Sequence, residues 1–297
     1  MFEYLLFPIL TSLFWAISPY FFTLAENEIG VNQLNVDRLL VASIIIGIIL
    51  LCFPIDLSVS TEQFNWLVLS GILGLVFSDF FLFTSYGKIG PRYSMLIMCI
   101  APAFSILGGH IFFSEYLGLI SIIGIGVAML GIGFVVGTRS ESNIKIKLRN
   151  IHPKLLIYAV LAAFGRAAGL LAIKQAILLG EISSIFTSFI RESTAAVIMI
   201  IVLLIVKKYK NPVSLYAKNK TALKWVVLGG FFGPVLGVTC SIISLQHVPV
   251  SIAQTIFATS PVFMLPISHF LFHDSVSIKS IIGVIIVTIG VAMIYCY

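Results

Sequence analysis

Charged side chains occur inside long apolar stretches of this sequence, where the burial of a charge is costly. Arg166 lies among small residues in "AVLAAFGRAAGLLA", and Arg191 and Glu192 are adjacent in "SFIRESTAAV". Asp79 precedes Tyr86 by two helical turns, so a helix would project both from one face. A charge in an apolar helix is a candidate functional group that needs a partner. Because a guanidinium matches a carboxylate through two hydrogen bonds, these residues predict a site for an anionic group, with Asp79 or Glu192 as a titrating acid.

Structural roles compete with this interpretation. Asp79 could form a structural ion pair with Arg166 as readily as serve a solute site. Arg191 and Glu192 are neighbours in sequence, so they point to different helix faces and do not simply neutralise each other. Arg38 lies early in its apolar run and is expected to be an interfacial anchor.

Uncharged polar residues add two candidates for solute binding. Trp15 shares a helical face with Thr11 and Ser18. Gln254 shares a helical face with two hydroxyl residues, Ser251 and Thr255. Hydroxyl groups commonly join helices in membranes, but a glutamine amide needs several partners there. No pattern matches a nucleotide loop, a metal cluster or a nucleophile triad, so we predict no catalytic residue, no metal and no cofactor.

The elements that would position these residues are apolar runs about as long as a bilayer is thick. Hydrophobic residues make up 59% of the 297 residues and charged residues 10%, against about 25% in soluble proteins. Backbone groups cannot stay unpaired in lipid, and the runs are too long and continuous for barrel strands. We therefore predict ten transmembrane helices, near 4–24, 34–55, 64–86, 92–113, 118–137, 155–179, 182–206, 222–245, 250–272 and 277–296.

The chain also contains an internal repeat. The segment "SIIG" occurs at 121–124 and again at 280–283, and the same offset along the chain relates Pro102 to Pro261. The repeat predicts two five-helix copies, 1–137 and 155–297, joined by a basic linker, 138–154. Because five is odd, the second copy enters the membrane from the opposite side, as in many secondary transporters. Two prolines at matched depth in inverted copies predict two matched bends, which can flank a central site and act as hinges.

Basic residues are concentrated in two of the predicted loops. Of the 18 lysines and arginines, 11 lie in 139–154 and 207–224. Basic loops stay cytoplasmic, which would place both termini outside. The net charge of +6 therefore does not indicate nucleic-acid binding.

Two long motifs resemble the EamA-type, two-repeat branch of the drug/metabolite transporter superfamily. They are "GLVFSDFFLFTSYGKIGPRYSMLIMCIAPAF" and "GPVLGVTCSIISLQHVPVSIAQTIFATSPVF", together with the Trp15 position. The resemblance covers nearly the whole chain. It implies alternating-access transport, often export, of amino acids, other small metabolites or drugs, without a cofactor or a soluble partner. The family's glycine–glutamate pair is replaced by Ser114–Glu115 and His273–Asp274, and its termini are generally inside, which leaves the orientation open.

The leading hypothesis is a secondary transporter, an exporter of a small metabolite such as an amino acid or organic anion. It would be a multi-pass protein of the cell membrane, a monomer or homodimer, driven by exchange or an ion gradient, with protons as the coupling ion. A lipid or lipid-linked flippase is the main alternative. A membrane-embedded enzyme would need acids and histidines clustered at one membrane face, and an oligomeric channel fits an inverted repeat less well.

Overall fold

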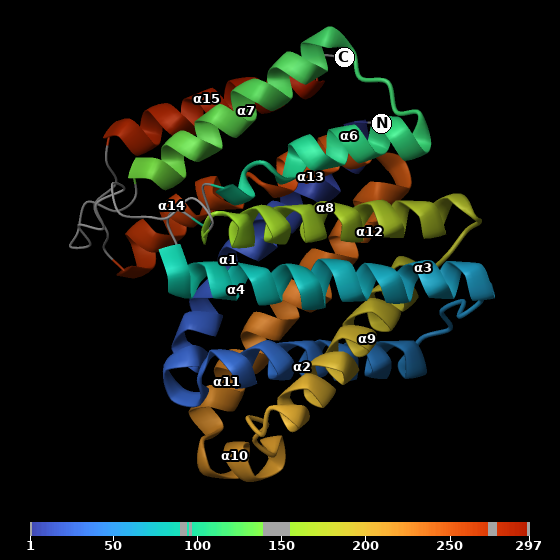
Figure 1. The fold of residues 1–297 in the computed structure, drawn as a ribbon, viewed down its shortest axis with the longest axis vertical. Coiled ribbons are helices and arrows are strands. Elements are labelled where there is room, and N and C mark those ends of the chain that lie inside the picture. The colour runs from blue at the N-terminus through green and yellow to red at the C-terminus, as the bar shows by residue number, and fades with distance from the viewer. Residues whose placement is uncertain (1, 90–93, 95–96, 139–154, 273–277, 296–297) are drawn as a thin grey trace.

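The computed structural model describes residues 2–89, 94, 97–138, 155–272 and 278–295. Within these ranges the chain consists of helices joined by short turns, and no strand occurs (Figure 1). The predicted all-helical class is therefore confirmed for this part of the chain. The basic linker residues 139–154 lie outside the described ranges.

Six of the predicted runs are continuous helices, each long and apolar enough to cross a membrane. Two of these runs consist of three consecutive helical segments. The bounds are α1 (Leu6–Ile29), α2 (Val31–Cys52), α3 (Thr61–Gly71) with η2 (Ile72–Phe77) and α4 (Ser78–Ile89), α8 (Ile157–Leu178), α9 (Ser184–Ile205), and α11 (Lys220–Gly230) with η5 (Phe231–Gly237) and α12 (Val238–His247).

The other predicted runs contain shorter apolar helices. These are α6 (Ala101–Phe113), α7 (Leu119–Thr138), α13 (Val250–Phe257), α14 (Ser260–Phe272) and α15 (Ile278–Tyr295). Two small helices, η1 (Phe2–Leu5) and α10 (Pro212–Lys218), complete the described fold.

Local sequence explains where several helices begin and end. Ser60 and Gln63 form a reciprocal capping box at the start of α3, with hydrogen bonds of 2.9 and 3.1 Å. Gly30 alone separates α1 from α2 and has φ +86°, a conformation that a side chain would strain. This one-residue turn holds the ends of α1 and α2 together.

The internal repeat extends to the helix boundaries. The offset that relates the two prolines also carries both ends of α3 onto those of α11, and both ends of α6 onto those of α14. Even a local irregularity recurs, because η2 and η5 are both π-helical segments and both begin directly after a glycine. In each, a backbone N–H bonds the carbonyl five positions earlier, Ser78 to Leu73 and Val238 to Gly233. The equivalent runs of the two copies therefore share their backbone geometry.

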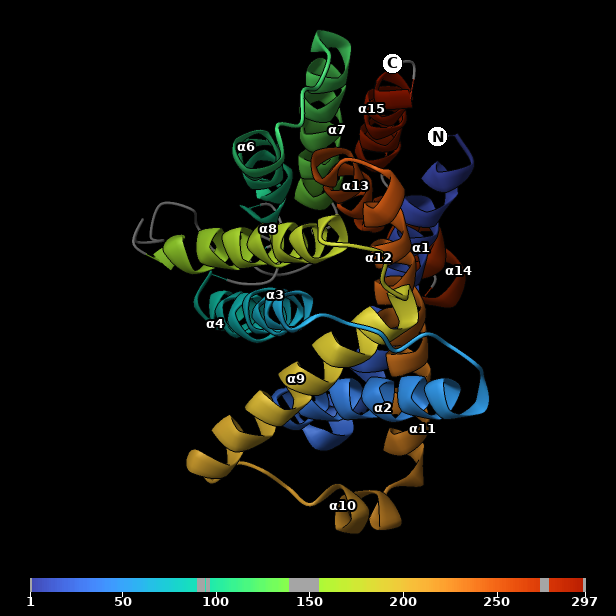
Figure 2. The same cartoon turned by 90° about the vertical axis from the view of Figure 1, so that its right-hand side faces the viewer.

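Helices of the two copies cross each other closely at glycines. A Cβ atom on Gly169 of α8 would lie 2.6 Å from Cα of Gly74 in η2. Along the α7–α15 pair, a Cβ on Gly124 would lie 2.8 Å from the carbonyl oxygen of Gly290. These two helices lie side by side at one end of the molecule (Figures 1 and 2). Small residues thus let the two backbones approach closely. Such close packing helps to join helices in a membrane, because lipid tails are as apolar as the side chains and burial of apolar surface gives little driving force.

The two predicted hinge prolines lie where an apolar run is interrupted. Pro102 and Pro261 are each the second residue of a helix, α6 and α14, and each helix follows a two-residue turn. A proline at this position loses no intrahelical hydrogen bond, because the first N–H groups of a helix have no partner within it. The prolines therefore mark the restart of a helix after a break in each run, and their role as hinges stays a prediction.

Candidate functional site

A cavity of about 430 Å³ lies among the helices of both copies. Its wall is mostly apolar and includes Trp15, Phe22 and Phe257. The breaks before α6 and α14 both contribute to it, through Cys99 and Ala258 respectively. Broken helices that border a cavity are typical of solute sites in membrane transporters.

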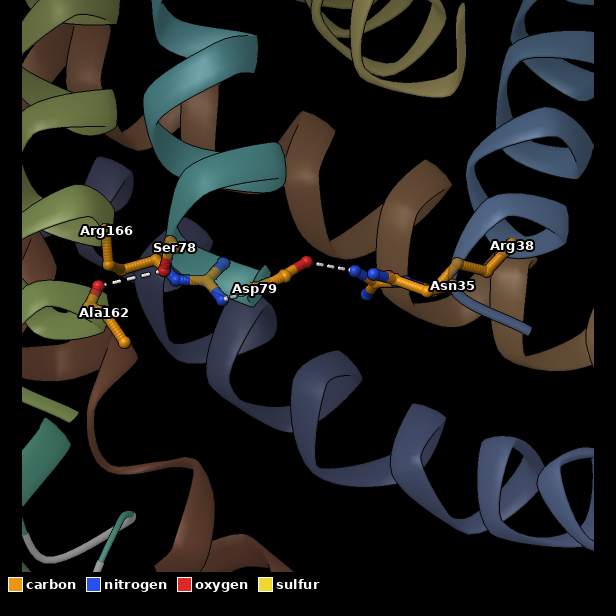
Figure 3. A network of polar contacts seen from close by, with 6 residues as sticks. All are labelled: Asn35, Arg38, Ser78, Asp79, Ala162 and Arg166. Carbon is orange, nitrogen blue, oxygen red and sulfur yellow. Dashed lines mark hydrogen bonds and ion pairs between the residues drawn. The ribbon is translucent and has the colours of Figure 1, made fainter. Parts of the chain in front are cut away.

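Asp79 forms the centre of the polar part of the wall. It is the second residue of α4, the helix that follows the π-helical segment η2, and its side chain is almost fully buried. Its Oδ1 accepts a hydrogen bond from Nη2 of Arg166 at 3.0 Å, and its Oδ2 is paired with Nη2 of Arg38 (Figure 3). One carboxylate thus lies between two guanidinium groups from α2 and α8.

The neighbouring residues fix this triad in place. Ser78 donates a hydrogen bond of 2.9 Å to the carbonyl of Ala162, which ties α4 to the helix that presents Arg166. Asn35 accepts from Nε of Arg38 at 2.8 Å, one turn away on α2. The three helices therefore hold the charged groups through contacts on both sides of Asp79 (Figure 3).

The Arg38–Asp79–Arg166 triad retains a surplus of positive charge. Two guanidiniums share one carboxylate, and the arginine side chains are 18% and 24% exposed. Both arginines also line the cavity. A guanidinium that is not fully used by its protein partner can bind a carboxylate, phosphate or sulfonate of a solute.

The structure places Arg38 differently from the sequence-based expectation. We expected an interfacial anchor, whereas its side chain points inward and pairs with Asp79. Its position only two turns into α2 suggested shallow depth, but α2 begins at a tight turn and Arg38 lies on its inner face. The i, i+3 spacing from Asn35 is the one sequence signal of that face.

Arg191 lies outside the set of cavity-lining residues. Its side chain is buried, 4% exposed, and its Nε donates to Oγ of Ser70 on α3 at 2.5 Å. Its Nη2 lies over Gly74, where a Cβ atom would be 3.5 Å away. Arg191 was predicted to bind solute, but its side chain lies in the contact between α9 and α3 and does not border this cavity.

Glu192 and Gln254 do line the cavity, and both are buried. Trp15 also lines it and makes an edge-to-face contact with Phe257, with 5.4 Å between the ring centroids. A Cβ on Gly237 would lie 2.5 Å from Cδ1 of Trp15, so this glycine makes room for the ring. Of the predicted solute residues, the cavity thus brings together Trp15, Asp79, Arg166, Glu192 and Gln254.

The remaining predicted residue is Tyr86. It belongs to α4, but its side chain lies outside the described atoms. Within the described ranges, no group of three or more histidine, cysteine, aspartate or glutamate residues could hold a metal ion. The cavity residues instead form a compact charged group in an apolar wall.

Comparisons with known proteins agree with this architecture. A crystal structure of a protein with 15% sequence identity has a TM-score of 0.77, and the alignment covers 99% of this chain and 97% of that chain. At this identity the likeness shows a shared fold. No curated protein matches the chain.

The family model for EamA-like transporters matches two segments, residues 2–137 and 153–296. Together they span almost the whole chain. Members of this family are membrane transporters of small solutes, which accords with the apolar helices and the cavity between them. The chain belongs to the EamA-like transporter family.

Proposed function

We propose that the chain is a secondary transporter that exports a small organic solute with an anionic group, by alternating access. The observation that carries this proposal is the Arg38–Asp79–Arg166 triad, in which two guanidiniums and one carboxylate lie on the wall of a cavity. A partly buried guanidinium attracts an anion more strongly than one in bulk water, because the lower dielectric around it strengthens the interaction. An amino acid or another organic acid with an apolar part fits this description.

The architecture that we propose is ten membrane-spanning helices in two inverted copies, 1–137 and 155–297, joined by the linker 138–154. The equal spacing of α3 and α11, of η2 and η5, and of α6 and α14 supports a duplicated unit. Five spans per copy make the copies antiparallel in the membrane, and such copies can rock about a central site.

The cavity is open where its lining reaches exposed residues, Thr23 and Glu26 near the α1–α2 turn. Hydrogen bonds also join the two copies: Glu115, which follows α6, accepts from the backbone N–H of Val250 at 3.0 Å and from Ser251 Oγ at 3.1 Å at the start of α13. In alternating access such contacts between the copies would break and form again as the opening changes sides.

The energy source that we propose is exchange or an ion gradient, with protons as the coupling ion and Asp79 or Glu192 as the titrating group. The motive is that these two acids are the carboxylates buried in the cavity wall. An Asp79→Asn variant should then lose gradient-driven accumulation and retain exchange of solute for solute.

Transport by the purified protein tests the proposal. Proteoliposomes are loaded with an equimolar mixture of amino acids and organic acids, and the solutes that leave are measured by mass spectrometry. We expect wild-type protein and Lys208→Ala, which changes an exposed lysine, to release the same anionic solutes. Arg166→Gln should release none above protein-free liposomes. Undiminished release by Arg166→Gln, or release of no anionic solute by wild type, would contradict the proposal.

A further inference from the structure

Three acceptor oxygens on the cavity wall lack a donor from the protein. They are both carboxylate oxygens of Glu192 and Oε1 of Gln254, each buried and without a hydrogen bond within the described residues. Glu192 is 0% exposed and Gln254 5%. The other buried side-chain atoms without a partner in this part of the chain are hydroxyl groups that do not line the cavity. The deficit at the cavity is thus specifically one of donors.

An unsatisfied buried acceptor is destabilising, and an ionised one more so. Such groups persist in functional sites when a ligand completes their hydrogen bonds. The two oxygens of Glu192 require a group with several N–H or O–H donors and, opposite a carboxylate, a positive charge, and Oε1 of Gln254 requires a further donor from the solute. We infer that Glu192 forms a second subsite of the cavity, which binds a protonated amine of the transported solute, and that Gln254 accepts a weaker hydrogen bond from the same solute.

The composition of the wall favours an amine over an inorganic cation. Calcium and magnesium require six or more oxygen ligands, whereas these two residues supply three oxygens among apolar neighbours such as Leu39 and Val238. A primary ammonium group has three N–H donors, and its organic substituent can pack against the apolar wall. Aromatic faces in the cavity also attract cations, as Phe22 already does with Arg38 at 5.8 Å.

The charged groups around Glu192 come from four helices. Arg191 is its neighbour on α9, and Arg38, Asp79 and Arg166 interact with it electrostatically from α2, α4 and α8. Asp79 pairs with Arg38 and Arg166. If the anionic group of the solute binds these two arginines, its negative charge would lie between them and the solute's own amine at Glu192. The subsite therefore rests on the proposed function, and it adds an amine to the anionic group of the solute.

Binding of three matched probes to the full chain in lipid nanodiscs tests the subsite. Benzylamine, benzyl alcohol and sodium benzoate share a ring and differ in the polar group, and calorimetric titration measures their affinities. We expect wild type to bind benzylamine more tightly than benzyl alcohol. Glu192→Gln should weaken benzylamine binding on the order of tenfold or more, the usual size of one charged hydrogen bond, and leave benzoate binding unchanged. Gln254→Leu should weaken benzylamine binding less.

The control is Glu28→Gln, which removes the same charge from an exposed residue of α1 outside the cavity lining and should leave benzylamine binding unchanged. Equal affinity of wild type for benzylamine and benzyl alcohol would overturn the subsite without recourse to any variant. Unchanged benzylamine binding in Glu192→Gln would also overturn it. The same holds if sodium ions give a response that depends on Glu192 and benzylamine gives none.

Two outcomes separate the subsite from the proposed function. Transport of anions together with amine binding that does not depend on Glu192 would refute this subsite alone. Glu192-dependent amine binding without any transport would refute the proposed function alone.

Discussion

Arg38 and Arg191 occupy equivalent positions in the two copies and have different surroundings. One offset along the chain carries both ends of α2 onto those of α9, and the same offset carries Arg38 onto Arg191. Their backbones pack alike, because the carbonyl of Arg191 faces Gly71 of α3 and that of Arg38 faces Gly230 of α11, the equivalent glycine. Their side chains differ, since Arg38 pairs with Asp79 on the cavity wall whereas Arg191 bonds Ser70.

The residues that face the arginines explain this divergence. The position equivalent to Asp79 in the second copy is Val238, by the same offset that relates α3 to α11. Val238 comes directly after η5, and Asp79 comes one residue after the end of η2. Unlike Asp79, Val238 carries no charge. The duplicated backbone therefore sets the crossing of the helices, and substitutions such as valine for aspartate at position 238 make the charged contacts of the two copies differ.

The largest effect is expected from removal of Asp79. In Asp79→Ala two partly buried guanidiniums lose their common partner, which we expect to lower the free energy of unfolding by up to about 3–5 kcal/mol, the loss for a fully buried pair. The equivalent change in the second copy, Val238→Ala, deletes only apolar contacts and should cost less. Thermal unfolding in detergent and the amount of folded protein in membranes measure both. An equal loss for the two variants would contradict the asymmetry of the charges.

A smaller difference is expected at the paired glycines. A Cβ on Gly71 would lie 2.9 Å from the carbonyl oxygen of Arg191, a backbone atom that cannot move alone. On Gly230 the nearest atom would be Cγ1 of Val41 at 3.1 Å, the end of a side chain. We expect Gly71→Ala to cost about 1–3 kcal/mol and Gly230→Ala less than Gly71→Ala. Melting temperatures of the two variants compare them, and a larger loss at Gly230 would show that the crossings are not packed as described.

The smallest effect concerns Asp37, whose counterpart in the second copy is Ile190. Asp37 accepts a hydrogen bond of 2.5 Å from Tyr216, which ties α10 to α2. Tyr216→Phe should cost about 1 kcal/mol, the net value of one hydrogen bond. Chemical denaturation of wild type and variant at several pH values measures this cost.

Burial, and then the bond to Asp37, raise the pKa of Tyr216 above its ordinary value of 10.0. For a group with a raised pKa, the stabilisation is fully present below the ordinary value and is lost only as the pH rises above it. The cost of Tyr216→Phe should therefore be the same at about pH 6 and about pH 9. A cost that disappears between these values would mean that the phenol ionises there and that the contact is not as described.

Much of the fold follows from the sequence, and the site follows in part. The length of an apolar run predicts a span because the bilayer thickness sets that length, and matched prolines reveal the repeat because the first turn of a helix favours proline. The pairing of Asp79 with Arg166 was one of two alternatives that the sequence left open, and the structure shows that pair. Helical periodicity identifies a face of one helix, but it does not identify the helix that packs there. For that reason Arg38 was assigned to the interface and Arg191 to the cavity.

The most direct test replaces the two equivalent arginines by the same residue, Arg38→Met and Arg191→Met. Methionine is apolar and flexible enough to fill either place, and Asp79 keeps Arg166 as a partner when Arg38 is replaced. Solute release from proteoliposomes, divided by the amount of folded protein, is measured for both. We predict that Arg38→Met falls to the background of protein-free liposomes and that Arg191→Met stays near the wild-type rate. Wild-type release by Arg38→Met, or loss of release by well-folded Arg191→Met, would contradict the assignment of the cavity charges.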